Sequence, residues 1–145
     1  MAMDTTGQYW RGEDAADLVD YLREFQAGGY PVRDVIGSVC SGCGGETFRV
    51  TADDEASCVQ RVCVTCGMAA YLADSAEYAA GADLQPCECP CGGERFEVAV
   101  GFAYRSDAEV RWVSVGLRCL ADGVLGVYAD WKIDYSPTAH LLTSV

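Results

Sequence analysis

Cysteine is the residue type with the clearest chemical potential in this chain, which contains nine cysteines among 145 residues. Two CxxC pairs, Cys40–Cys43 and Cys63–Cys66, are separated by 19 residues. Zinc prefers thiolate ligands, and two CxxC turns can present four sulfurs in a tetrahedron. A single CxxC pair also fits a redox dithiol, but two pairs at this spacing favour a metal. We therefore predict a first metal site made of Cys40, Cys43, Cys63 and Cys66.

An internal repeat links these cysteines to a second cluster. Residues 43–50 and 91–98 both read CGGExFxV, 48 positions apart, whereas Cys63 and Cys119 correspond at an offset of 56. The second copy therefore has eight additional residues between its two cysteine clusters. We expect the tip of a β-hairpin at this place, because hairpin tips tolerate insertion.

The second copy leaves its metal ligands open. At the offsets of the repeat, Asp122 takes the place of Cys66, and Glu88 takes the place of Cys40. Carboxylate oxygen is an acceptable but less common zinc ligand, and loss of the metal would leave exposed thiols as a liability. We predict a second metal site whose ligands are either Cys87, Cys89, Cys91 and Cys119, or Cys89, Cys91, Cys119 and Asp122. The ninth cysteine, Cys58, is expected to be a small buried residue.

Charge and composition exclude several classes of protein. The formal net charge is −12, and the ten Lys and Arg residues are scattered. Binding of phosphate needs a basic face, so nucleic acid is an improbable partner. No apolar run approaches the ~20 residues of a membrane span, and residues 1–11 do not resemble a secretory signal. We therefore expect a cytoplasmic protein with reduced thiols, and its alanine- and arginine-rich composition suggests a bacterial source.

One helix and several short strands are expected to position the metal sites. Residues 13–27 have the apolar spacing of an amphipathic helix, which we expect to pack on the rest of the chain, with docking of a partner as the alternative. Alternating apolar residues after each CGGE motif, such as Phe96 and Val98, predict antiparallel strands. Ser106 to Glu109 would form a turn between two of them.

These elements predict a small metal-bound α+β fold in four parts. Residues 1–37 would hold the helix and a linker, residues 38–84 a first zinc ribbon, and residues 85–135 a second. Residues 136–145 form a tail in which Ser136 and Pro137 signal a short helix over residues 138–142.

The two knuckle motifs, CSGCG at residues 40–44 and CVTCG at residues 63–67, resemble those of the zinc-ribbon and rubredoxin-like class. A weaker match to the same knuckle pattern extends from Cys89 to Gly123. The resemblance covers roughly residues 38–135 and implies three-stranded β-ribbons with a metal ion between two knuckles. It implies no single activity, because such ribbons serve as structural parts, recruitment modules or electron carriers.

Few residues suggest catalysis. The only histidine, His140, lies in the tail, and the motifs of metalloproteases, zinc deaminases, α/β-hydrolases and nucleotide-binding enzymes are absent. We predict a non-enzymatic protein with two structural zinc ions that acts as an interaction, inhibitor or immunity-type module for another, basic protein. A rubredoxin-like iron electron carrier is the alternative, and a metal hydrolase with a labile second site is a lower one. Aromatic residues of the second copy would bind the partner unless they fill the core: Tyr128, Trp131 and Tyr135.

Overall fold

The computed structural model describes residues 3–145, which form an α+β fold with one N-terminal α-helix and an antiparallel sheet. The helix α1 (Ala15–Phe25) precedes all eight strands of the sheet. The strands are β1 (Asp34–Gly37), β2 (Phe48–Asp53), β3 (Cys58–Cys63), β4 (Ala69–Tyr71), β5 (Gln85–Pro86), β6 (Phe96–Tyr104), β7 (Val110–Cys119) and β8 (Leu125–Lys132). Four short 3-10 helices complete the described chain: η1 (Ala27–Gly29), η2 (Ser75–Glu77), η3 (Ala79–Gly81) and η4 (Ala139–Thr143).

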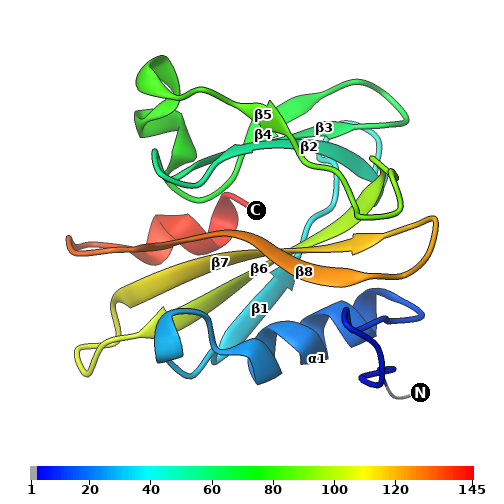
Figure 1. Ribbon diagram of the computed structural model, residues 1–145. Helices are drawn as coiled ribbons and strands as arrows, with labels where there is room; N and C mark the ends of the chain where they lie inside the picture. Colours follow the sequence, from blue (N-terminus) through cyan, green and yellow to red (C-terminus); the bar gives the residue numbers. More distant parts are fainter. Residues whose placement is uncertain (1–2) are drawn as a thin grey trace.

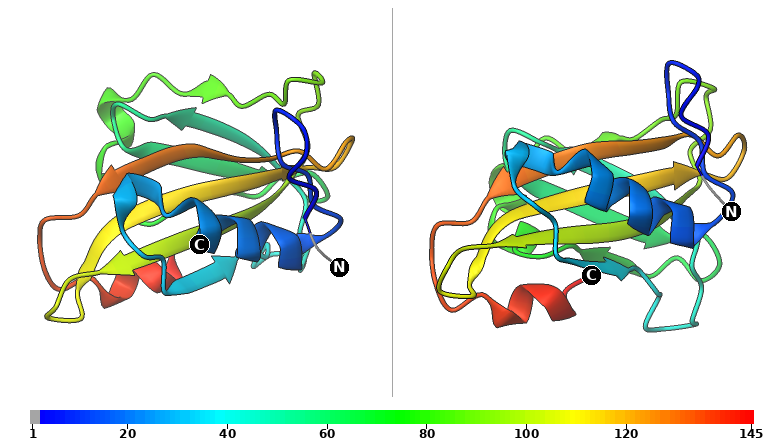
Figure 2. Two further views of the ribbon diagram at one scale, coloured as in Figure 1. Left: turned by 60° about the horizontal axis from the view of Figure 1, so that its bottom comes forward. Right: turned by 90° about the horizontal axis from the view of Figure 1, so that it is seen from below.

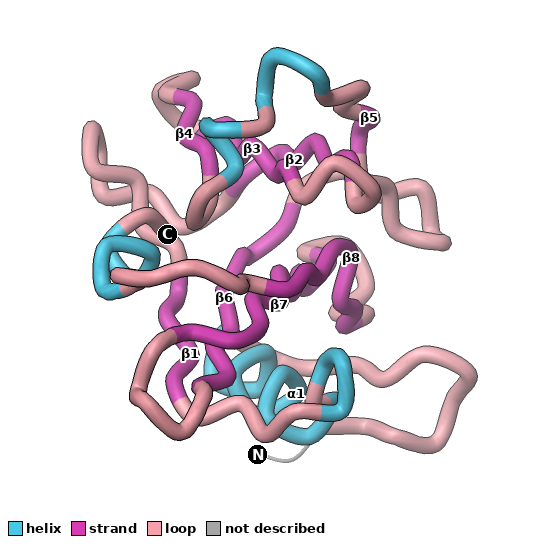
Figure 3. The backbone as a smooth tube through the Cα atoms, turned by 90° about the vertical axis from the view of Figure 1, so that its left-hand side faces the viewer, coloured by secondary structure: helices cyan, strands magenta, loops and turns pink. Residues whose placement is uncertain are grey.

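The strand order is β4-β3-β2-β6-β7-β8. It consists of two three-stranded units, β2–β4 from the first copy and β6–β8 from the second. They join through β2 and β6, which share a single residue pair, Phe48 with Phe96. Beyond that pair the strands diverge, and β5 pairs with β2 while β1 pairs with β6. The result is three layers, with α1 below, β1 and β6–β8 in the middle, and β2–β5 above (Figures 1 and 3).

The hairpin of the second copy is longer than that of the first. In the first copy, β2 and β3 pair from Phe48–Cys63 to Asp53–Cys58. In the second copy, β6 and β7 continue for several more pairs before the turn over residues 105–109. The additional residues therefore lie in the hairpin, as expected from the sequence offset.

The core lies between the two β layers and follows the predicted alternation. Phe48, Phe96 and Val100 are fully buried within one cluster that also includes Val113 and Leu141. Burial of such apolar surface is the main stabilising contribution to the fold, at roughly 25 cal/mol per Å².

The helix α1 covers the opposite face of β6–β8 (Figure 2). It begins at Asp14, whose side chain accepts a hydrogen bond from the Asp17 amide, and it ends within the predicted range of 13–27. Leu18 and Leu22 are buried. The Leu22 side chain approaches β7 so closely that only a small residue fits at Gly116. A Cβ atom on Gly116 would lie 2.8 Å from the Leu22 side chain. Phe25 departs from the expected buried face, since 52% of it is exposed.

The predicted four parts are joined into one structure. Strand β1 belongs to the predicted linker yet pairs with β6 of the second copy. The tail forms η4 close to the predicted position, and the Ser144 carbonyl accepts a hydrogen bond of 2.6 Å from the Ala73 amide of the first copy. Among the described residues, α1 and the 3-10 helices are all too short or too polar to cross a membrane.

Candidate metal centres

The first candidate centre gathers the four cysteines of the two CxxC pairs. The sulfurs of Cys40, Cys43, Cys63 and Cys66 all lie within 4.8 Å of one another. The Cys40–Cys66 and Cys43–Cys63 sulfur distances are 3.5 and 3.6 Å. Tetrahedral zinc with Zn–S bonds of about 2.3 Å requires sulfur–sulfur distances of about 3.8 Å. The four thiols are thus already close to the geometry that a zinc ion needs.

Two tight turns hold these sulfurs in place. The amides of Gly44 and Gly67 donate hydrogen bonds of 2.8 and 2.9 Å to the carbonyls of Cys40 and Cys63. Both glycines have a left-handed backbone, with φ of 77° and 80°, which residues with a Cβ atom adopt at a cost. Backbone amides of Cys66 and Thr65 lower the pKa of Cys63 to about 6, and amides of Gly42 and Cys43 lower the pKa of Cys40. At these two positions the turns therefore favour the thiolate, the form that binds metal. The Gly45 amide also lowers the pKa of Cys43, but hydrogen bonds with the Cys63 and Cys66 thiols outweigh this effect and raise that pKa to about 12.

The second candidate centre consists of Cys89, Cys91, Cys119 and Asp122, whose ligand atoms also lie within 4.8 Å of one another. The Cys91 and Cys119 sulfurs are 3.7 Å apart. The Cys89 sulfur lies 3.5 and 3.7 Å from the two carboxylate oxygens of Asp122. A tetrahedral zinc ion with one sulfur and one oxygen ligand at ordinary bond lengths separates them by about 3.6 Å. This set of three thiols and one carboxylate also fits a tetrahedral ion.

Hydrogen bonds show that Cys89, and not Glu88, is the counterpart of Cys40. The Cys40 amide donates to the Gly45 carbonyl, and the Cys89 amide donates to the Gly93 carbonyl, both at 2.8 Å. The alignment of Glu88 with Cys40 is therefore wrong by one residue. The reason is a shorter turn, since the second copy has one residue between its paired cysteines where the first has two.

Cys87 lies outside the second centre. Its amide donates a hydrogen bond of 2.8 Å to the Val50 carbonyl, and its side chain is buried in the core. Burial raises the pKa of Cys87 to about 11, which favours the neutral thiol. Of the two ligand sets that the sequence leaves open, the structure brings together the one that includes Asp122.

Cys58, the ninth cysteine, is fully buried on β3. Its thiol lies 3.4 Å from the Ser75 carbonyl, to which it donates a weak hydrogen bond. Burial raises its pKa. These features agree with the expected structural role.

Of the three aromatic residues expected either to bind a partner or to fill the core, Trp131 is in the core. Trp131 is only 5% exposed, and its indole donates a 3.0 Å hydrogen bond to Asp74. The Tyr135 hydroxyl donates to the other oxygen of Asp74 at 2.8 Å. The first copy covers this end of β8, and the buried Asp74 carboxylate requires these donors. Tyr128, half-buried, packs against Phe96 with ring centres 5.6 Å apart.

The N-terminal segment supports the second centre in a way that the repeat does not reveal. The Gly12 amide donates a 2.8 Å hydrogen bond to the Gly123 carbonyl, and the Leu125 amide donates one of the same length to the Trp10 carbonyl. Arg11 adds a 3.3 Å hydrogen bond to the Asp122 carbonyl. The segment before α1 thus braces the turn that carries Asp122. The sequence offers no signal for this contact, because residues 1–12 contain neither a repeat nor a motif.

The donor atoms of both centres can hold metal ions. Either zinc or iron suits four thiolates, so the identity of the metal does not follow from the first centre alone. Comparison with family models, curated proteins and solved structures finds nothing that matches this chain. The function is therefore argued from the two centres and from the surface of the molecule.

Proposed function

We propose that this chain is a non-enzymatic protein with two structural zinc ions, and that it acts as an interaction module, of the inhibitor or immunity type, for a basic partner protein. The observation that carries the proposal is the gathering of two four-ligand groups on hydrogen-bonded turns. A centre whose four positions are all filled by protein atoms has none free for water, which is typical of structural zinc.

The position of the centres supports a structural role. Each centre ties the turn before the first strand of a hairpin to the turn after the second strand. Phe48 and Phe96, which form the only described residue pair between β2 and β6, follow directly after these turns. A metal ion on each side would therefore fix the junction of the two copies.

The charge supports a basic partner. The formal net charge is −12 without metal. A zinc ion bound by four anionic ligands leaves each centre with a formal charge of about −2. Such a surface would attract a positively charged protein and speed its association at low salt.

Native mass spectrometry with elemental analysis is the first test. We expect two zinc ions per chain, and we expect chelation to unfold the protein. Capture of basic proteins from a lysate, released by added salt, would test the interaction role separately. A folded and stable chain without metal would contradict the structural role, and a chain that retains no basic protein would contradict the interaction role.

A rubredoxin-like iron electron carrier is the second candidate, since the first centre consists of four thiolates. Ferric iron bound by four thiolates is red, whereas the zinc form is colourless. A colourless preparation with full metal content would exclude this candidate.

A metal hydrolase is a third candidate, favoured by the oxygen ligand of the second centre. A surface pocket of about 440 Å³ lies next to this centre, and its charged lining residues are Arg49 and Arg95, which are basic, and Glu94, which is acidic. If Asp122 yielded its place to water, an anionic substrate could bind beside it. A screen of hydrolysis substrates, with the Asp122→Asn variant as control, tests this candidate, and uniformly flat rates would end it.

A further inference from the structure

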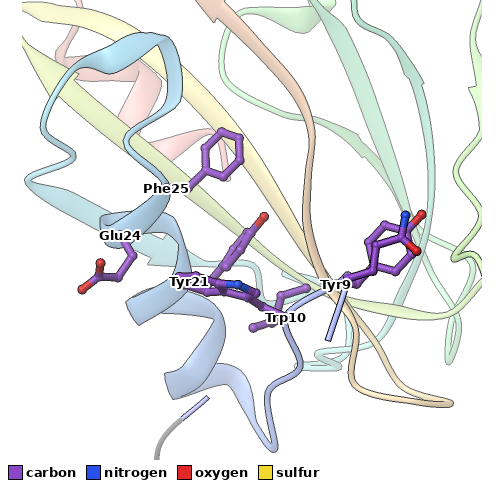
Figure 4. A pocket seen from close by; sticks show the side chains of 7 residues that line it. Tyr9, Trp10, Tyr21, Glu24 and Phe25 are labelled. Atoms are coloured by element: carbon purple, nitrogen blue, oxygen red, sulfur yellow. The ribbon is translucent and has the colours of Figure 1, made fainter. Parts of the chain in front are cut away.

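A hollow lined by aromatic side chains lies between α1 and the N-terminal segment. It has a volume of about 350 Å³ and is lined by Tyr9, Trp10, Tyr21 and Phe25 over the buried Leu125. The Trp10 and Tyr21 rings have centres 5.9 Å apart, and the Tyr21 and Phe25 rings 5.8 Å. Figure 4 shows Phe25, Tyr21 and Trp10 in a row, with Tyr9 on the side of the N-terminal segment.

This hollow continues toward the second metal centre. A second hollow of about 270 Å³ shares Tyr9 and Leu125 with the first and extends to Tyr128 and Pro90. Pro90 stands between the ligands Cys89 and Cys91. We call the two hollows together the aromatic groove, lined by Tyr9, Trp10, Tyr21, Phe25, Leu125 and Tyr128.

The groove is exposed to solvent although it is apolar. Tyr9 is 45% exposed and Phe25 is 52% exposed, and they are two of the six large apolar residues that project into solvent among the described residues. A contiguous aromatic surface of this kind marks a binding site more often than scattered apolar residues do. Tyrosine and tryptophan are also the residues that contribute most at protein interfaces.

The charges at the groove are all of one sign. Glu24 lines its rim near Phe25, pointing away from the rings in Figure 4, and Glu88 lines the opposite end. No Lys or Arg lines either hollow. The second metal centre adds further negative charge beside Pro90, since its four ligands are anionic when they bind a divalent ion.

We propose that the aromatic groove binds an extended basic segment of the partner protein, with an arginine or lysine side chain laid across the rings. This inference rests on the proposed interaction role. Cations are attracted to the faces of aromatic rings, and the apolar stem of such a side chain covers apolar surface while its charged end stays near carboxylates. Glu24 and Glu88 at the two ends suit a segment with a basic residue at each end and apolar residues between.

The test uses the zinc-loaded protein and a labelled peptide in which arginine alternates with leucine, with a glutamate-for-arginine peptide as control. Fluorescence polarisation measures affinity, and NMR follows the indole signal of Trp10. The Tyr9→Ala/Phe25→Ala variant should weaken binding of the arginine peptide at least about tenfold, and Glu88→Gln should weaken it less.

Tyr78→Ala and Glu77→Gln are matched controls, because Tyr78 is 44% exposed and both residues lie outside the groove. The metal content and melting temperature of each variant establish that it is folded.

Several results would contradict the proposal that the aromatic groove binds an extended basic segment. One is equal affinity of the wild type and the Tyr9→Ala/Phe25→Ala variant, and another is binding of the glutamate peptide as strong as that of the arginine peptide. Free arginine amide binding as tightly as the peptide would also contradict a site for an extended segment. If basic proteins are still captured by the Tyr9→Ala/Phe25→Ala variant, the interaction role stands, but the partner binds outside the aromatic groove. If the wild type captures none, the interaction role itself fails.

Discussion

Replacing Asp122 by cysteine tests the second centre most directly, because Asp122 holds the position that Cys66 holds in the first. The ligands gathered by the structure are four cysteines in one group, and three cysteines and one aspartate in the other, which makes seven sulfurs and one carboxylate for two ions. The Asp122→Cys variant should bind both ions through eight sulfurs. Gly67 and Gly123 follow the two positions with nearly equal φ of 80° and 79°, so the same turn can present a cysteine in either place.

The expected effect is a tighter second centre. Thiolate is the softer ligand and is the commoner one in structural zinc sites, so we expect zinc affinity of this centre to rise at least about tenfold. At a fixed excess of free zinc, a tenfold gain in affinity adds about 1.4 kcal/mol to the free energy of unfolding. Asp122→Ala should have the opposite effect, because it leaves three ligands and removes the carboxylate that accepts the Val124 amide at 3.1 Å.

Cadmium NMR measures this outcome one site at a time, since the cadmium resonance moves with the number of thiolate ligands. The wild type should give two separate resonances, and in Asp122→Cys the resonance of the second centre should move toward that of the first. Cys87→Ser is the control and should leave both resonances in place. Two tetrathiolate resonances in the wild type, or a shift in Cys87→Ser, would refute the ligand set with Asp122.

Three further predictions concern stability and metal content. Cys66→Ser should reduce the zinc content from two ions to one, measured by elemental analysis. Asp74→Ala should lower the free energy of unfolding by about 3 kcal/mol in denaturant titration, because the buried Trp131 donor and the half-buried Tyr135 donor lose their shared acceptor. Gly123→Ala should destabilise the protein by about 1–3 kcal/mol more than Gly67→Ala, by thermal unfolding, because only at Gly123 would the new Cβ meet a backbone atom, 2.6 Å from the Gly12 carbonyl oxygen.

Each of these predictions has a built-in control. Cys58→Ala should keep both zinc ions, since Cys58 belongs to neither ligand group. Asp74→Asn keeps the shape and one acceptor oxygen, so its cost should fall between those of the wild type and the alanine variant. Equal costs for the two glycine variants would mean that the contact with Gly12 contributes nothing.

The sequence predicts the first centre and the alternation of the core well, because both follow from short-range patterns. Two CxxC pairs bring four ligands together through local turns, and strand periodicity decides which face is buried. It leaves the second centre open because one residue is missing from its first turn. Position counting then aligns Cys40 with Glu88, whereas the hydrogen bonds of Cys89 reveal the true counterpart.

The contacts between distant parts of the chain could not be predicted. The sequence leaves open whether Trp131 is buried or exposed, and only the fold shows that Asp74 of the other copy lies against it. Phe25 has the spacing of a buried helix residue, but at the last position of α1 it is 52% exposed. The contact of Gly12 with the turn at Gly123 joins segments about 110 residues apart, and no local pattern encodes such a pairing.

The hydrogen bond between Trp131 and Asp74 has a consequence for biosynthesis. A ribosome completes the first copy long before it makes Trp131, and domains generally fold in the order of synthesis. Until residue 131 emerges, Asp74 lacks its indole donor, and until the second copy is made the apolar face around Phe48 lacks Phe96 and the other residues that cover it. Metal capture by Cys40, Cys43, Cys63 and Cys66 needs none of the later chain, so zinc could order the nascent first copy and protect its thiols while the second copy is still being translated.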